Sequence, residues 1–231
     1  MDAAPNPTSV AALIGEPARA TILLALLGGQ SLPATDLAYR CRLTPQTIST
    51  HLARLVDGGL LSLERNGRHK YYRLASPQVG QALEALNALA QPQPIRSLRQ
   101  SEEVVALRFA RTCYDHLAGT LGVGVTQALG RRGYIEESGT QFRLTAHGST
   151  WLHELGIDPA ALERSRRTFA TQCLDWSERR HHIGGALGAA LAKRFFELGW
   201  IARSSTTRAV RLTATGRAGL LKELDIQLPE Q

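Results

Sequence analysis

Cysteine is scarce in this sequence, with three residues among 231 that lie far apart. This low, dispersed content excludes a disulfide scaffold and leaves packing, metal binding or redox sensing for the thiols. No run of about 20 apolar residues occurs, and residues 1–7 lack a charged start and an apolar core. We therefore expect a cytoplasmic protein with neither a membrane span nor an export signal.

Enzyme signatures are missing as well. The chain has no nucleophile elbow, no paired acidic motif and no zinc-protease signature. Its basic residues outnumber the acidic ones by 27 to 20, and the resulting net charge of +7 favours a polyanionic partner. These features predict a protein that binds nucleic acid and is not an enzyme.

The clearest predicted helix covers residues 44–57. Thr44 is a good N-cap, Pro45 suits the first helical position, and Gly58-Gly59 ends the helix. Ile48, Leu52 and Leu55 recur at helical spacing and are expected to face a core. An ordinary surface helix fits this pattern, but the polar outer face also suits the DNA major groove. That face consists of Thr44, Gln46, Thr47, Ser49, Thr50, His51 and Arg54.

A cationic hairpin is predicted directly after this helix. Residues 60–64 are strand-like, Asn66-Gly67 is a turn signal, and residues 69–74 alternate as a second strand, which together make a two-stranded wing. A cationic tip beside a polar helix fits phosphate anchoring next to base readout. The candidate DNA contacts in the hairpin are Arg65, Arg68, His69 and Lys70.

Residues 16–27, 43–60 and 66–74 together resemble the ArsR/SmtB family of bacterial winged-helix repressors. The resemblance covers roughly residues 8–90. It implies that residues 44–57 are the recognition helix and that residues 60–74 are the wing. It further implies a homodimeric repressor that releases double-stranded operator DNA when an inducer binds.

The two metal sites familiar in that family are not carried over. Residues 36–41, before the predicted turn, offer the single Cys41 where a Cys-x-Cys motif is usual, and we interpret Cys41 as a small buried side chain. Residues 78–90 contain neither Asp nor His. An inducer site is therefore expected elsewhere in the chain.

The chain after residue 91 contains a predicted linker and an internal duplication. Pro92 and Pro94 lie among polar neighbours and predict a linker over residues 92–96. It separates a DNA-binding and dimerisation domain, residues 1–91, from a sensory region, residues 97–231. In that region Gly119-x-Leu121-Gly122 recurs 66 residues later, and Gly133-Tyr134-Ile135 recurs at the same offset with Trp in place of Tyr. Arg143-Leu144-Thr145-Ala146-His147-Gly148 recurs 68 residues later with Thr in place of His.

Each copy implies a helix, a strand, a turn, a strand and a helix. We infer two degenerate winged-helix-like repeats, at about residues 97–158 and 159–231. The predicted fold class is mainly α with small β-hairpins, α+β overall, with the winged helix-turn-helix at the N-terminus.

The duplication also aligns Cys, Asp and His residues. The first copy carries Cys113, Asp115 and His116, and the second carries Cys173, Asp175 and His182, with His181 beside the last. Packing of the repeats about a pseudo-two-fold axis would bring these groups together. On a helix, the i,i+3 spacing of Cys113 and His116 would place both on one face.

Three interpretations of this cluster stay open. The first is a tetrahedral, zinc-like sensor site of Cys113, His116, Cys173 and His182, with Asp115 or Asp175 as ligand or supporting group and His181 as an additional candidate. The second is a thiol switch at Cys113 and Cys173 that an oxidant or electrophile modifies. The third is a purely structural cluster that was duplicated with its scaffold.

The function expected from these features is a sequence-specific transcriptional repressor whose effector, a metal ion or a thiol-reactive species, is sensed in the C-terminal region. Two alternatives stand beside it. One is an architectural protein that binds DNA without sequence preference, and the other is the winged-helix adaptor of a nucleic-acid-modifying enzyme.

Overall fold

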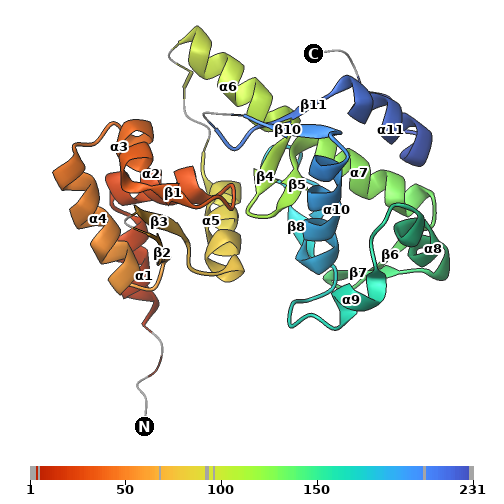
Figure 1. Cartoon of the computed structure of the whole chain (residues 1–231), viewed down its shortest axis with the longest axis horizontal. Coiled ribbons are helices and arrows are strands. Elements are labelled where there is room, and N and C mark those ends of the chain that lie inside the picture. The colour runs from red at the N-terminus through yellow and green to blue at the C-terminus, as the bar shows by residue number, and fades with distance from the viewer. Residues whose placement is uncertain are drawn as a thin grey trace. The chain divides into compact units, whose positions relative to one another are not determined.

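A computed structural model describes residues 4, 6–67, 69–91, 94–95, 97–204 and 207–228. The chain divides into two compact units, Met1–Glu84 and Ala85–Gln231. Figure 1 labels their helices and strands. Arg68 of the expected wing and positions 92, 93 and 96 of the expected linker lie outside the described residues.

The first unit is a winged helix-turn-helix. Its antiparallel sheet has the strand order β1-β3-β2, and helix α5 crosses the boundary into the second unit. The elements are α1 (Pro7–Ile14), α2 (Pro17–Leu26), β1 (Leu32–Pro33), α3 (Ala34–Cys41), α4 (Pro45–Asp57), β2 (Leu61–Asn66), β3 (His69–Leu74) and α5 (Pro77–Leu89). The helix predicted over residues 44–57 and the two-stranded hairpin predicted after it are therefore present, as α4 and β2–β3.

Local polar contacts fix the start of this unit. The Glu16 carboxylate caps α2 by accepting hydrogen bonds from the backbone N–H groups of Ala18 and Arg19. The buried Arg19 guanidinium donates in turn to the carbonyl oxygens of Ala12 and Leu13, at 2.8 and 2.7 Å, and so satisfies the C-terminal end of α1. No single helix in the described chain is long and apolar enough to span a membrane, although α1 and α2, joined by an 88° bend, together meet that criterion by length and composition.

Apolar residues of α2, α3 and α4 form the core of the first unit. Ile48, Leu52 and Leu55 are buried, as their helical spacing predicts. Cys41 ends α3 and is half-buried. Burial raises the pKa of its thiol, which fits a packing role better than a reactive one.

The second unit begins with α6 (Leu98–Phe109) and then contains the two repeats. The first repeat runs through β4 (Arg111–Cys113), β5 (His116–Ala118), α7 (Gly119–Arg131), β6 (Ile135–Ser138), β7 (Gln141–Leu144) and α8 (Ala146–Glu154). After α9 (Pro159–Glu163), the second runs through β8 (Gln172–Leu174), β9 (His181–Ile183), α10 (Gly185–Glu197), β10 (Ile201–Arg203), β11 (Val210–Leu212) and α11 (Ala214–Leu224). The expected helix, strand, turn, strand, helix unit is present twice, but each copy also starts with a short hairpin that the sequence did not indicate.

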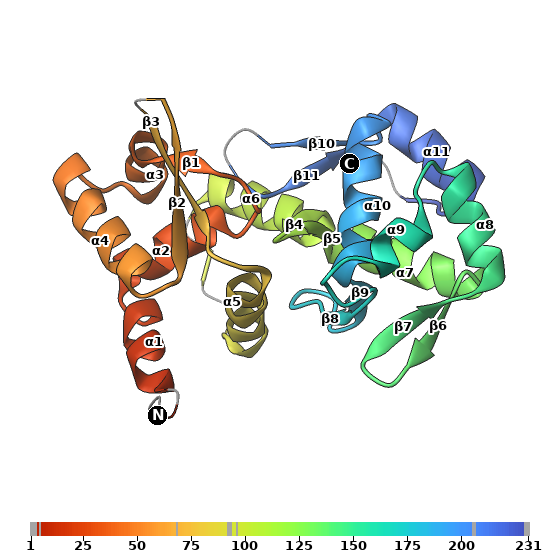
Figure 2. The ribbon, with the colours of Figure 1, turned by 60° about the horizontal axis from the view of Figure 1, so that its bottom comes forward.

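The two repeats exchange contacts. Helix α10 packs on β5 of the first repeat, α7 packs on β9 of the second, and β5 lies beside β9. Single antiparallel bridges join Arg111 to Ala209 and Gln141 to Thr171, so each opening hairpin adjoins the closing hairpin of the other repeat. The repeats share one buried apolar cluster that draws on both copies. Figure 2 shows the ribbons of both repeats, including α7 and α10.

The recurring Leu-Thr-x-x-Gly motif has a steric explanation. The Thr145 hydroxyl caps α8 by accepting from Gly148 N at 3.0 Å, and Thr213 caps α11 in the same way from Gly216 N at 2.9 Å. A Cβ atom at Gly148 would lie 2.1 Å from the Tyr134 carbonyl oxygen, which already accepts from Thr145 N. Only glycine therefore lets the helix start this close to the preceding strand.

We predict that Gly148→Ala lowers the free energy of unfolding by about 2 kcal/mol or more, because the new methyl group must displace a backbone carbonyl. Gly124→Ala is the matched control, since a Cβ there meets nothing within 4 Å in the described structure. That helical site should gain about 0.5–1 kcal/mol. Urea denaturation of both variants checks the pair, and equal stabilities would contradict the packing of this motif.

Candidate functional site

The outer face of α4 presents short polar side chains to solvent. Thr44 caps the helix by accepting from Thr47 N at 3.2 Å, and the residue is exposed. The exposed residues on this face are Thr44, Gln46, Thr47, Ser49, Thr50 and Arg54. Among the described residues Gln46 has no side-chain hydrogen-bond partner, so its amide can pair with an external donor and acceptor.

His51 differs from the other residues proposed for this face. Its side chain is only 15% exposed, and its Nδ1 lies 3.5 Å from Glu16 Oε2, the carboxylate that caps α2. The imidazole therefore contacts the protein and ties α4 to the start of α2. Among the described members of the predicted DNA-contact set, His51 is the least accessible.

The β2–β3 hairpin carries exposed cations next to its turn. Arg65 and Lys70 are cross-strand partners and are both exposed, as is His69. Farther from the turn, Arg73 forms an ion pair with Glu64 at 2.8 Å. The described cations nearest the tip are thus Arg65 and Lys70.

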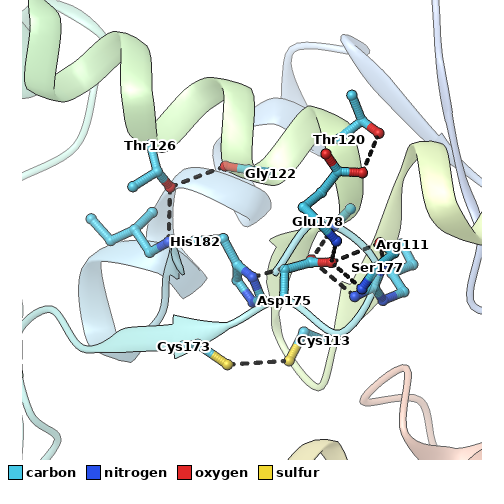
Figure 3. A network of polar contacts seen from close by, with 12 residues as sticks. Arg111, Cys113, Thr120, Gly122, Thr126, Cys173, Asp175, Ser177, Glu178 and His182 are labelled. Atoms are coloured by element: carbon cyan, nitrogen blue, oxygen red, sulfur yellow. Dashed lines mark hydrogen bonds and ion pairs between the residues drawn. The ribbon is translucent and has the colours of Figure 1, made fainter. Parts of the chain in front are cut away.

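The second candidate site lies where the opening hairpins of the two repeats meet. Cys113 faces His116 across β4–β5, and Cys173 faces His182 across β8–β9. One possible ligand atom from each of these four residues lies within 4.8 Å of the others, and the two Sγ atoms are 3.8 Å apart. Figure 3 shows the two sulfur atoms facing each other from different repeats. The predicted convergence is therefore present.

The route to this convergence differs from the predicted one. Cys113 and His116 do not share a helix face, because they belong to two antiparallel strands joined by a two-residue turn at Tyr114 and Asp115. Tyr114 has a φ of 58°, the left-handed conformation that tight hairpins require. The i,i+3 spacing therefore reflects a hairpin and not a helix.

Glycines let the helices approach both hairpins. A Cβ at Gly122 of α7 would lie 2.4 Å from the Leu117 carbonyl oxygen and 3.8 Å from His182 Cβ. A Cβ at Gly188 of α10 would lie 2.3 Å from the Ile183 carbonyl oxygen and 3.1 Å from His116 Cβ. The recurring glycines thus explain how each helix reaches the histidine of the opposite repeat.

Each histidine has a carboxylate beside its Nδ1. Asp115 Oδ1 lies 3.3 Å from His116 Nδ1, and Asp175 Oδ2 lies 3.3 Å from His182 Nδ1. Asp115 also pairs with Arg167 through two contacts, at 2.6 and 3.4 Å. Neither carboxylate belongs to the convergent four-residue group, and each lies beside the histidine of its own repeat. His181 is exposed, and it follows the alternation of strand residues by pointing away from His182.

Asp175 organises the loop that separates β8 from β9. Its Oδ1 accepts from Ser177 N, Ser177 Oγ and Glu178 N, while its Oδ2 accepts from Arg111 Nη2 at 2.9 Å and Gly119 N at 2.7 Å. Arg111 is 1% exposed, and its guanidinium also lies over the Trp176 ring at 4.3 Å. Sequence reasoning missed Arg111, although an arginine beside the apolar residues Phe109 and Ala110 is a signal of a buried charge that needs a partner.

Three side chains in and beside the cluster, His116, Cys173 and Asp175, have shifted pKa values. Burial opposes ionisation of His116, but Asp115 and the neighbouring Cys173 outweigh it and raise the pKa of His116 to about 9. The Cys113 hydrogen bond, together with the two imidazoles, lowers the pKa of the Cys173 thiol against the opposing effect of burial. Burial alone would raise the pKa of the Asp175 carboxyl group. His182, Arg111 and Ser177 stabilise the carboxylate more strongly, so its pKa lies well below the ordinary range.

The described Cys/His group has the composition of a metal centre. Two thiol and two imidazole ligands are the donor set of many structural zinc sites. A closed set of four ligands leaves no open position for a substrate, which separates this arrangement from a catalytic metal site.

Comparison with known proteins places the chain among regulators. A family model described as a helix-turn-helix domain matches residues 14–64. The chain is 42% identical over 224 residues to a Bacillus subtilis (strain 168) protein named as the uncharacterized HTH-type transcriptional regulator YdfF. That match covers 97% of this chain and 99% of its relative.

Solved structures of regulators show smaller similarities. Reduced HlyU from Vibrio cholerae N16961 is 27% identical, with a TM-score of 0.34, over 37% of this chain and 90% of HlyU. NolR from Sinorhizobium fredii is 24% identical, with a TM-score of 0.34, over 38% of this chain and 96% of NolR. The near-complete match to YdfF, in contrast, spans both units. The chain therefore belongs to the family of helix-turn-helix transcriptional regulators that includes YdfF, as the winged-helix resemblance of its first third predicts.

Proposed function

We propose that this regulator is a homodimeric repressor that binds a specific double-stranded operator through α4 and the β2–β3 wing, and that an effector bound in the second unit releases it. The observation that carries the proposal is the exposed polar face of α4 beside the cationic hairpin. Because its partner is chromosomal DNA, the protein would act in the cytoplasm.

Sequence-specific binding is supported by the chemistry of the α4 face. Side-chain amides pair with base edges through two hydrogen bonds, and Gln46 is exposed near the N-terminal end of the helix. The Ser49 and Thr50 hydroxyls donate to helix carbonyls, at 2.8 and 3.2 Å, but keep acceptor lone pairs for an external donor. Arg65 and Lys70 supply the charge that holds the hairpin against phosphates.

Homodimerisation is supported by apolar side chains that the described chain leaves exposed. Leu86 and Leu89 of α5 are 47% and 78% exposed, and Val10 of α1 is 39% exposed. Helix α1 has no buried residue. Such surfaces mark contacts with other proteins, and a two-fold dimer presents two copies of α4 to an operator of matching symmetry.

Effector-controlled release is supported by the architecture of the second unit. The helix-turn-helix elements that would contact DNA all lie in the first unit. Residues Ala85–Gln231 form a separate compact body. This body contains a largely buried group of two Cys and two His side chains. An effector releases DNA only if it stabilises a dimer geometry that binds DNA less well.

Selection of bound fragments from a random DNA pool, followed by footprinting, tests the proposal. We expect a palindromic consensus. Gln46→Ala should lower discrimination at one position of each half-site by about 1–3 kcal/mol, because one amide pair to a base is lost. Gln141→Ala, which removes an exposed glutamine from β7 in the second unit, is the control and should leave the consensus unchanged. Binding of every fragment with equal affinity would favour the architectural alternative.

The wing is tested by the salt dependence of binding. Arg65→Ala and Lys70→Ala should each weaken binding to specific and random DNA alike, and should reduce the slope of log K against log salt by about 1. Arg143→Ala serves as the control, since Arg143 is an exposed cation on the β6–β7 hairpin and pairs with Glu136. A slope that changes with Arg143 and stays constant with Arg65 and Lys70 would refute the assignment of the wing.

The dimer is tested by sedimentation equilibrium. Leu89→Glu should raise the dimer dissociation constant by at least about tenfold, because it places a charge in an interface that excludes water. Leu174→Glu is the control, since Leu174 is an apolar residue that is 41% exposed in the second unit. A monomeric wild type would exclude the proposed assembly.

A further inference from the structure

We propose that the second unit binds one divalent ion of the zinc class through the sulfur atoms of Cys113 and Cys173 and the Nε2 atoms of His116 and His182. This ion would be the effector of the proposed function, so the regulatory part of the inference rests on that function. The binding site itself does not, because all four ligands belong to the second unit.

The separation of the sulfur atoms fits tetrahedral coordination. Zinc–sulfur bonds of about 2.3 Å place two thiolates of a tetrahedron about 3.8 Å apart. The measured separation between Cys113 Sγ and Cys173 Sγ is 3.8 Å. All four ligand atoms lie within 4.8 Å of one another. The largest distance between two ligand atoms therefore has to shorten by about 1 Å to match tetrahedral coordination. Small changes of side-chain torsion angles can supply this movement.

The two imidazoles supply independent evidence for a ligand. His116 is 5% exposed and His182 is 1% exposed. Their Nε2 atoms make no hydrogen bond to any residue that the structure describes. Burying a polar nitrogen without a partner is costly, so such atoms in a native protein need a reason. A coordinated ion provides that reason for both rings.

The carboxylates orient the rings for this task. Asp115 and Asp175 lie 3.3 Å from the Nδ1 atoms of His116 and His182, respectively. A carboxylate at Nδ1 holds the proton there and leaves the Nε2 lone pair for a metal. In the first repeat His116 Nδ1 and Asp115 Oδ1 form a hydrogen bond. In the second repeat Asp175 lies close to His182 Nδ1, but the geometry of the two atoms is not that of a hydrogen bond.

The donor set selects the kind of ion. Thiolate and imidazole ligands favour zinc, cobalt and softer ions over calcium and magnesium, which require oxygen. Cys173 is half-buried while the other three ligands are buried, so an ion can enter from the side of β8. Bound there, it would join the opening hairpins of the two repeats, since each hairpin supplies one Cys and one His.

A thiol switch explains less of this geometry. Formation of a Cys113–Cys173 disulfide would have to bring the sulfurs from 3.8 Å to about 2.05 Å, and each thiol would lose one proton and one electron to an added oxidant. The reaction uses neither Nε2 atom. The paired His and Asp residues are accounted for by metal coordination and not by oxidation.

The test uses reduced, full-length protein stripped of metal with a chelator. We expect one equivalent of Zn²⁺ by competition with a chromophoric chelator, and Co²⁺ should give the visible bands of tetrahedral coordination with a thiolate charge-transfer band. Zn²⁺ should also raise the thermal unfolding midpoint, because the ion binds only the folded state.

Variants identify the ligands by matched pairs. Cys113→Ser, Cys173→Ser and His182→Ala should each weaken Zn²⁺ binding by more than about 100-fold, since even supporting groups contribute 10–100-fold. Cys41→Ser removes the remaining cysteine, and His181→Ala removes the exposed neighbour of His182. Both controls should bind as the wild type does. Circular dichroism of each metal-free variant separates loss of a ligand from loss of the fold.

Two outcomes overturn the site. One is the absence of stoichiometric Zn²⁺ or Co²⁺ binding by the folded wild type, including the case in which peroxide converts Cys113 and Cys173 to a disulfide. The other is unchanged affinity in folded Cys113→Ser and His182→Ala variants. Zn²⁺ that binds but leaves the affinity for the selected DNA unchanged overturns the effector role alone. Loss of specific DNA binding with intact Zn²⁺ binding counts against the proposed function and not against the site.

Discussion

The buried carboxylate of Asp175 is the contact on which the second unit depends. It is fully buried and accepts hydrogen bonds from Arg111, from the first residue of α7 and from its own loop. A buried charge persists only when it is paired and its lone pairs are satisfied. Arg111 provides the charge and Gly119 N provides the dipole of a helix start. One side chain thereby fixes a loop of the second repeat to the strand and helix of the first, and it also reaches His182.

The two repeats contribute the same possible metal ligands, one Cys and one His each, but the Asp residues beside the two histidines have different surroundings. Cys and His oppose each other across both opening hairpins. In the first repeat the supporting Asp115 is partly exposed and pairs with Arg167, whereas in the second Asp175 is buried with Arg111. Asp115 and His116 are adjacent, whereas six residues, 176–181, separate Asp175 from His182. The first of these residues form the loop that wraps around Asp175. Asp175 therefore both approaches a histidine and helps to hold the second unit together, whereas Asp115 lies near solvent.

Local signals in the sequence predicted α4, its cap, the wing and the two repeats, because each depends on residues that are neighbours along the chain. The alignment of the copies also brought Cys113, His116, Cys173 and His182 together as candidates. The hairpins that carry them could not be predicted, since three-residue strands such as β4 have no usable periodicity, and the i,i+3 spacing indicated a helix instead. Arg111 was not predicted because its partner Asp175 is 64 residues away in the other repeat. The exposure of His181 follows from strand alternation, which becomes readable only when β9 is known to be a strand.

The exchange of contacts between the repeats gives the second unit a means of responding as a whole. Helix α7 packs against β9, α10 packs against β5, and glycines hold both helices close to the histidines of the opposite copy. A displacement of the backbone at the hairpins would be passed to both repeats, because close-packed interiors transmit displacement. A ligand that joins the hairpins would therefore act on α7 and α10 together, since its differential affinity for two arrangements sets how far it can shift them. Coupling at this level requires no contact between the ligand and DNA, only a dimer whose geometry depends on the arrangement of the repeats.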